Sequence, residues 1–165
     1  MGVRGSVVVC ALLAAALAAP AAMAEQGRWR VLLGDDGQAS ASLFSLNSLT
    51  IGSRALEYRP LLTISCSGPE WVQSLRLRDL VGGGPMAVTV QLDGRGGSES
   101  WETTTRRGTL VRSGKDGVAR LLEASRMRLA WSNGFFSGSG EAVFNLSGID
   151  QAVAHLAEAC GDVMP

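Results

Sequence analysis

Alternation between apolar and polar residues runs through the middle of the chain and constrains its fold more than any other feature. In residues 85–94, Met86, Val88 and Val90 alternate with smaller or polar residues before an Asp-Gly turn. A period of two places successive side chains on opposite faces of a β-strand, so one face of each segment can be buried. The same pattern recurs in residues 60–66, 74–80, 126–131 and 141–147.

Breaks rich in Gly, Pro, Asn or Ser separate these segments, at residues 66–70, 81–85, 93–98 and 132–140. Regular short breaks of this kind indicate an antiparallel meander or a sandwich. Residues around 99–105 are expected to form a shorter strand with Trp101 facing inward. Residues 29–51 mix strand signals with small residues, and we expect one or two early strands there.

Helical periodicity replaces alternation in two places. Residues 116–124 carry Val118, Leu121 and Leu122 at the spacing of one helix face, with Asp116 as a possible cap. A short crossover helix is therefore expected in this segment.

The second helix is expected from Ile149 or Asp150 to Cys160, where Ile149, Val153, Leu156 and Cys160 form a single apolar stripe. Ser147 or Gly148 is the expected cap. Together these patterns predict an α+β fold, mostly antiparallel β, with a short crossover helix and a C-terminal helix packed on the sheet.

The beginning of the chain is typical of a secretory signal peptide. Arg4 precedes an apolar stretch over residues 7–19, and a small-x-small cleavage site occupies residues 22–24. A membrane anchor is the alternative, but a spanning helix needs about 20 apolar residues and this stretch is shorter. We therefore expect a signal peptide over residues 1–24 and a single β-rich domain over residues 25–165, with the mature chain periplasmic or secreted.

Two of the three cysteines remain once the signal peptide and its Cys10 are removed. Cys66 shares the apolar face of its strand, and Cys160 lies on the apolar stripe of the terminal helix. An exported chain with two cysteines is expected to form one disulfide, here Cys66–Cys160. For so long a loop the chain-entropy model gives roughly 4 to 5 kcal/mol of stabilisation.

Catalytic and metal-binding patterns are weak. His155 is the only histidine, it lies off the apolar stripe, and a catalytic triad would require Ser147 or Asp150 to converge on it. Metal binding by His155 with Cys66 and Cys160 is less favoured than a disulfide and a solvated histidine. We expect no catalytic residue, no metal and no cofactor, and an unrecognised hydrolase is the least favoured alternative.

Two surface features are candidates for partner binding. Arg76 with Arg78, and Arg126 with Arg128, each project from one face of a strand, and they would form a basic strip if those strands were neighbours. A solvated outer sheet face is the alternative. The balance of 15 basic and 15 acidic residues argues against nucleic acid as the main partner.

A pair of aromatic residues, Phe135 and Phe136, lies between glycine- and serine-rich segments. Two large apolar side chains in such a loop are costly unless they are buried or offered to a partner. Core filling by at least one of them is the favoured interpretation, and partner binding is the alternative.

Several segments together resemble the periplasmic accessory proteins of bacterial type VI secretion, of the VasI type, and similar small exported proteobacterial proteins of uncharacterised function. These segments are "LLTISC", "VTVQLDG" followed by the tryptophan of "SESWETT", "RMRLAW" and "VFNLSGIDQAVAHLAEAC". The likeness covers roughly residues 60–160. The matching positions are Cys66, Asp93, Trp101, Phe144, Leu146, Gly148 and Cys160.

The chain departs from that family in two places. Gln91 and Leu92 replace an aromatic-basic pair, and "GDVMP" follows the last cysteine where the family commonly has a tryptophan. The resemblance implies a non-enzymatic exported accessory protein that binds another envelope protein. The alternative is a module that binds a glycan or lipid fragment of the envelope.

Overall fold

Strands make up most of the elements of this protein. The computed structural model describes residues 28–34, 38–51, 56–78, 83–104, 108–133 and 137–165, so the expected signal peptide lies outside the described residues. The strands are β1 (Arg30–Leu33), β2 (Gln38–Phe44), β3 (Leu49–Ile51), β4 (Leu56–Tyr58), β5 (Leu61–Ser67), β6 (Glu70–Arg76), β7 (Gly84–Leu92), β8 (Arg95–Thr103), β9 (Thr109–Ser113), β10 (Arg126–Asn133) and β11 (Ser137–Asn145). The helices are α1 (Lys115–Leu122) and α2 (Ile149–Cys160).

Nine strands form one antiparallel sheet in the order β1-β2-β5-β6-β9-β8-β7-β10-β11, and β3 pairs with β4 separately. Two-residue turns join β5 to β6 and β7 to β8, and in the second turn Asp93 adopts a φ of 48° before Gly94. Helix α1 connects β9 to β10, which lies on the far side of β8 and β7. The expected α+β fold, with its crossover helix and C-terminal helix, is confirmed.

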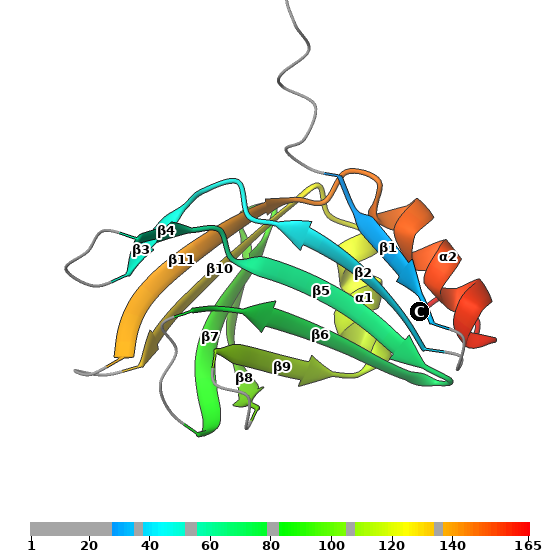
Figure 1. Ribbon diagram of the computed structural model, residues 1–165, viewed down its shortest axis with the longest axis horizontal. Helices are drawn as coiled ribbons and strands as arrows, with labels where there is room; N and C mark the ends of the chain where they lie inside the picture. The colour runs from blue at the N-terminus through cyan, green and yellow to red at the C-terminus, as the bar shows by residue number, and fades with distance from the viewer. Residues whose placement is uncertain (1–27, 35–37, 52–55, 79–82, 105–107, 134–136) are drawn as a thin grey trace, which may run out of the picture.

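The sheet curls, so that β10 and β11 lie behind β2 and β5 in the view of Figure 1. Its inner face carries the hydrophobic core, in which Trp71, Trp101 and Phe144 are fully buried. Helix α2 packs against the inner face of β1, β2 and β5, and α1 packs against β6. Trp101 points inward, as the alternation around it predicts.

The segment after β2 covers the edge of β11. The Leu46 N–H donates to the Val143 carbonyl at 2.6 Å. The Asn47 side chain then acts like a piece of backbone, because its Oδ1 accepts from the Val143 N–H at 2.9 Å and its Nδ2 donates to the Glu141 carbonyl at 2.7 Å. The curled sheet is thereby closed at this end, and the edge groups of β11 at Val143 are satisfied.

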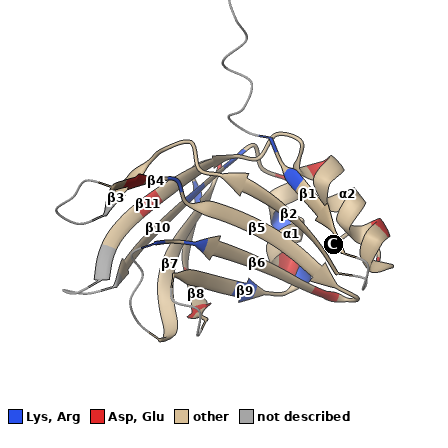
Figure 2. Cartoon of the chain, in the orientation of Figure 1, with Lys and Arg blue, Asp and Glu red and all other residues tan. Residues whose placement is uncertain are grey.

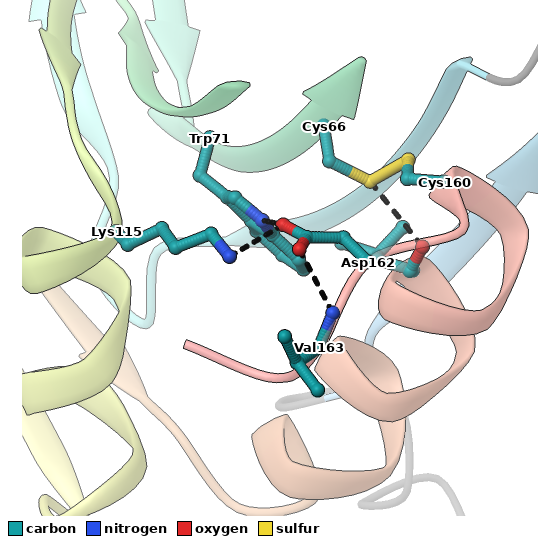
Figure 3. Close-up of a disulfide and its surroundings, with 7 residues drawn as sticks. Cys66, Trp71, Lys115, Cys160, Asp162 and Val163 are labelled. Carbon is teal, nitrogen blue, oxygen red and sulfur yellow. Dashed lines mark hydrogen bonds and ion pairs between the residues drawn. A yellow bond between two sulfur atoms is a disulfide. The ribbon is translucent and has the colours of Figure 1, made fainter. Parts of the chain in front are cut away.

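A disulfide between Cys66 and Cys160 ties α2 to the end of β5, with 6.2 Å between the two Cα atoms. Beyond it, Gly161 ends the helix in the left-handed conformation. The turn brings Asp162 to the Trp71 indole, whose Nε1 donates to Oδ2 at 2.8 Å, and to the Lys115 ammonium at 2.6 Å (Figure 3). The chain end is therefore joined to β5, β6 and α1.

The expected cap of α1 is wrong, whereas the N-cap of α2 is Gly148, one of the two residues expected there. Gly114, not Asp116, is the N-cap of α1, and Asp116 lies in the first turn, where it pairs with Arg112. Gly148 precedes α2 in the left-handed conformation without a side-chain cap, while the Ser147 hydroxyl bonds to Asn145. In both places glycine supplies a backbone conformation that a serine or aspartate cap does not adopt easily.

The expected break over residues 66–70 is shorter than the glycine and proline suggest. Only Gly68 and Pro69 lie in the turn, and β6 already begins at Glu70. Residues 29–51, whose pattern predicts one or two strands, contain β1, β2 and β3.

Candidate anion-binding pocket

A pocket of about 410 Å³ opens where β2 ends and β5 begins. Three of its lining side chains are arginines, two are aromatic and two are leucines. They are Phe44, Tyr58, Arg59, Leu61, Arg76, Leu77 and Arg78. This mixture of cationic and apolar groups is suited to an anion that also carries an apolar part.

Strand register assembles the pocket. Phe44 is the last residue of β2 and lies opposite Leu61 at the start of β5, which in turn lies opposite Arg76 at the end of β6. The buried neighbours of these residues face the core, so all three side chains point to the outer face of the sheet. Residues from three strands thus meet in one row.

Two guanidinium groups flank the Phe44 ring, which is 39% exposed. The Arg30 guanidinium carbon lies 5.6 Å and the Arg59 guanidinium carbon 5.8 Å from the ring centroid. Cation–π attraction at these distances holds the planar groups near the ring. The aromatic side chain therefore orders two positive charges on the outer face.

Arg59 is held from the other side as well. Its Nε donates to the Ser45 carbonyl at 2.5 Å, and its two terminal nitrogens take no part in this bond. Nη2 is buried and has no hydrogen-bond partner within the described part of the chain. A buried guanidinium donor without an acceptor is costly, and an anion in the pocket would supply one.

None of the four arginines of this outer-face group, Arg30, Arg59, Arg76 and Arg78, forms an ion pair with a carboxylate of the described residues. Glu57 precedes Tyr58 on β4, but it is exposed where Tyr58 is buried, so the two side chains point to opposite faces. Figure 2 shows basic segments at the end of β6 and just before β5. The pocket therefore has an excess of positive charge.

The basic strip across Arg76, Arg78, Arg126 and Arg128 required their strands to be neighbours, and they are not. Strand β6 is separated from β10 by β9, β8 and β7. Arg76 and Arg78 line the pocket described above, whereas Arg126 and Arg128 line a second one beside Asp93. Two arginine pairs on separated strands cannot make one surface.

Arg128 is also neutralised where it lies. It pairs with Glu141 on the neighbouring strand β11, and this contact raises the Arg128 pKa and lowers the Glu141 pKa. Asp93 does not face a ligand either, because its two carboxylate oxygens accept from the backbone N–H groups of Ser125 and Arg126. Arg128 and Asp93 are therefore both paired within the chain.

Phe135 and Phe136 lie outside the described residues. Core filling and the alternative of partner binding both stay predictions.

Sequence reasoning missed Phe44, Tyr58, Arg59 and Arg30 as parts of a site. Phe44 ends an alternating segment, "QASASLF", in which it falls on the polar face, and that misplacement is the one local signal that was available. Arg59 lies between two strands and carries no periodic signal. Only the pairing of distant strands shows that these residues are neighbours.

Other candidate chemistry is dispersed. His155 is exposed on α2, as expected for a solvated histidine. Among the described residues, no cluster of three or more His, Cys, Asp or Glu side chains is arranged to hold a metal ion. Within the same residues, no helix has the length and apolar character needed to cross a membrane.

Comparison of the chain with known protein families, with curated proteins and with solved structures gives no match.

Proposed function

We propose that this protein is an exported, non-enzymatic binding domain whose arginine-lined pocket receives an acidic segment of another envelope protein. The observation that carries the proposal is the outer-face group of four arginines, which have no carboxylate partner among the described residues. Electrostatic complementarity of this kind steers a partner and fixes its orientation. The ordered guanidinium groups beside Phe44 also reduce the entropy that binding must offset.

The finer proposal is an accessory role in type VI secretion, in the periplasm. It rests on the resemblance of residues 60–160 to that family. The matching positions include Cys66, Cys160, Trp101 and Phe144, which here form the disulfide and part of the buried core. These positions support a shared architecture, while the binding chemistry comes from the pocket.

A second candidate function is the binding of a phosphate- or carboxylate-bearing fragment of an envelope glycan or lipid. The observation that favours it is the size of the pocket, about 410 Å³, because small-molecule sites typically measure about 300–1,000 Å³. Arginine is suited to either class of partner, since its planar donors match both carboxylate and phosphate.

Photo-cross-linking separates the two candidates. A photoreactive residue in place of Leu61, on the pocket wall, is irradiated in an envelope extract of the source cells. The expected result is one protein adduct that Arg76→Ser with Arg78→Ser reduces roughly tenfold, because two of the pocket's charges are removed.

The matched control is Arg95→Ser with Arg126→Ser, which removes the same charge from exposed positions on β8 and β10. This control is expected to retain the adduct. A lipid or glycan adduct in place of the protein would favour the second candidate. Equal labelling in both double variants would contradict binding at this pocket.

A further inference from the structure

The two edges of the nine-stranded sheet differ. The edge of β11 is covered, because Leu46 and the Asn47 side chain bond to Val143 and Glu141. The edge of β1 has no strand beside it among the described residues. Exposed edges are usually blunted by proline, bulges or charge because they invite pairing with another chain.

Hydrogen-bond alternation identifies the unpaired groups of β1. The Gly34 N–H donates to the Gln38 carbonyl, so Gly34 directs its backbone toward β2. Alternate residues of an antiparallel strand point to opposite sides, and Val31 and Leu33 therefore direct their N–H and C=O groups to the open edge. This edge carries no proline or bulge, and its Leu32 and Leu33 are 69% and 62% exposed.

A groove runs beside this edge. It has a volume of about 370 Å³ and lies between the start of β1 and helix α2, with Trp29, Gln151 and His155 among its lining residues. The Trp29 Nε1–H is buried and has no acceptor in the described ranges of the chain. The groove thus combines unpaired backbone groups with an indole donor that lacks a partner.

The charge around the groove is positive. Arg28 lines it, Arg30 begins the edge strand, and neither forms an ion pair among the described residues. Arg30 also stacks on Phe44, so the edge is continuous with the outer-face arginine group. An extended segment that pairs with β1 would therefore place acidic side chains next to these arginines.

We infer that an acidic, extended segment of the partner protein adds to the sheet as a strand beside β1. This inference rests on the proposed function and names the manner of docking. Main-chain hydrogen bonds to Val31 and Leu33 supply affinity in this mode, and side chains of alternate residues supply specificity. The acidic residues face Arg28 and Arg30, and a carbonyl or carboxylate accepts from Trp29.

The test uses the full mature chain and two short probe peptides, one alternating glutamate with valine and one alternating lysine with valine. The acidic peptide is expected to slow amide hydrogen exchange at Val31 and Leu33, because both N–H groups become donors. Leu33→Pro is expected to weaken binding roughly tenfold relative to Leu33→Ala, since only proline removes the N–H.

Leu33→Pro is expected to keep the melting temperature of Leu33→Ala, because the Leu33 N–H is not used by β2 and a residue before proline favours the extended conformation that Leu32 already has. Arg28→Glu is a second variant, which leaves the strand unchanged. It is expected to abolish the preference for the acidic peptide, because the introduced carboxylate would offset the charge of Arg30.

Several results would overturn the inference. They are unchanged amide exchange with the acidic peptide, equal binding of both peptides, or a free chain that is a dimer and becomes a monomer on Leu33→Pro, which would assign the edge to a second copy. If the cross-link at Leu61 survives Leu33→Pro but is lost in Arg76→Ser with Arg78→Ser, strand addition fails while the proposed function stands. If the cross-link is instead lost in Leu33→Pro and survives in Arg76→Ser with Arg78→Ser, binding at the pocket is rejected and strand addition at β1 stands.

Discussion

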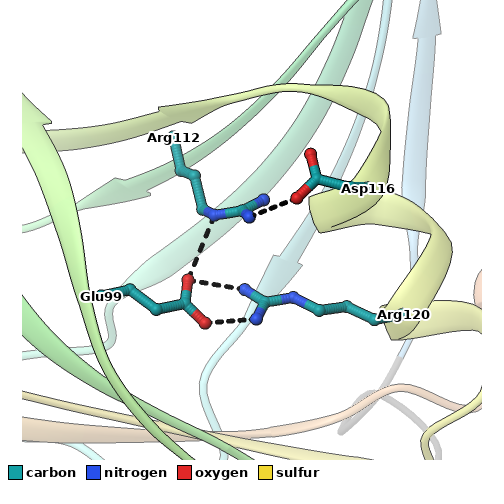
Figure 4. A network of polar contacts seen from close by, with 4 residues as sticks. All are labelled: Glu99, Arg112, Asp116 and Arg120. Carbon is teal, nitrogen blue, oxygen red and sulfur yellow. Dashed lines mark hydrogen bonds and ion pairs between the residues drawn. The ribbon is translucent and has the colours of Figure 1, made fainter.

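Arginines on the inner and outer faces of the sheet differ in their ion pairing. On the inner side, Arg112 and Arg120 both contact Glu99, and Arg112 also pairs with Asp116 at 2.6 Å (Figure 4). On the outer side, the four arginines around Phe44 have no carboxylate partner among the described residues. Burial requires the inner charges to be satisfied within the chain, whereas the outer charges are available to another molecule.

The inner network is built closely around a glycine. A Cβ added to Gly117 of α1 would lie 1.7 Å from Arg112 Nη1 and 2.5 Å from Gln73 Nε2. The absence of a side chain lets α1 approach β6 and β9 and lets the Arg112 guanidinium lie beneath it. These arginines therefore hold helix α1 on the sheet, whereas a binding role is proposed for the outer group.

Among these changes, removal of the disulfide should lower the free energy of unfolding most. Cys66→Ser with Cys160→Ser is expected to lower the free energy of unfolding by about 4 kcal/mol, because the unfolded chain is no longer constrained over a long loop. Urea unfolding followed by Trp fluorescence measures this loss. A free energy of unfolding equal to that of the oxidised parent chain would show that the disulfide does not stabilise the fold.

Loss of the Glu99 carboxylate, which Arg112 and Arg120 share, should have the second largest effect on stability. Glu99→Ala is expected to cost about 3 kcal/mol, because two partly buried arginines lose their common partner. Glu102→Ala is the matched control, since Glu102 is exposed on the same strand and faces outward. Equal melting temperatures for the two variants would contradict the conclusion that ion pairs on the inner face stabilise the fold.

Acid should produce a smaller effect at the chain end. Lys115, and then the Trp71 indole, lower the Asp162 pKa below its ordinary value of 3.8. A carboxyl whose pKa is lower in the folded state stabilises the fold above its ordinary pKa, and this contribution is lost as the pH falls through the lowered pKa.

The measurement is thermal unfolding between neutral pH and pH 3 or below. The parent chain is expected to lose more stability over that range than Asp162→Asn, which lacks the titrating group. Parallel curves for the two proteins would mean that Asp162 contributes no such linkage.

Outer-face arginines should matter least for stability. Arg76→Ser with Arg78→Ser is expected to change the free energy of unfolding by no more than about 0.5 kcal/mol, because both are exposed and neither pairs with a described carboxylate. The same urea titration provides the measurement. A cost as large as that of Glu99→Ala would mean that the outer group is structural, like the inner one.

Much of the architecture could be predicted locally. Alternation at Met86, Val88 and Val90 and the helical stripe ending at Cys160 depend only on neighbouring residues, and both features are confirmed. The disulfide followed from two cysteines on apolar faces. The site could not be predicted in this way, because Phe44, Arg59 and Arg76 meet only after β2, β5 and β6 have paired.

The sequence by itself determined which faces are buried, where the helices lie and which cysteines join, since periodicity and residue chemistry are carried by short segments. Tertiary structure alone decided which arginines are neutralised, which meet around Phe44 and which sheet edge stays open. The physical reason is that ion pairs and edge coverage depend on strand order and on the curl of the sheet. Those properties come from contacts between residues far apart in the chain.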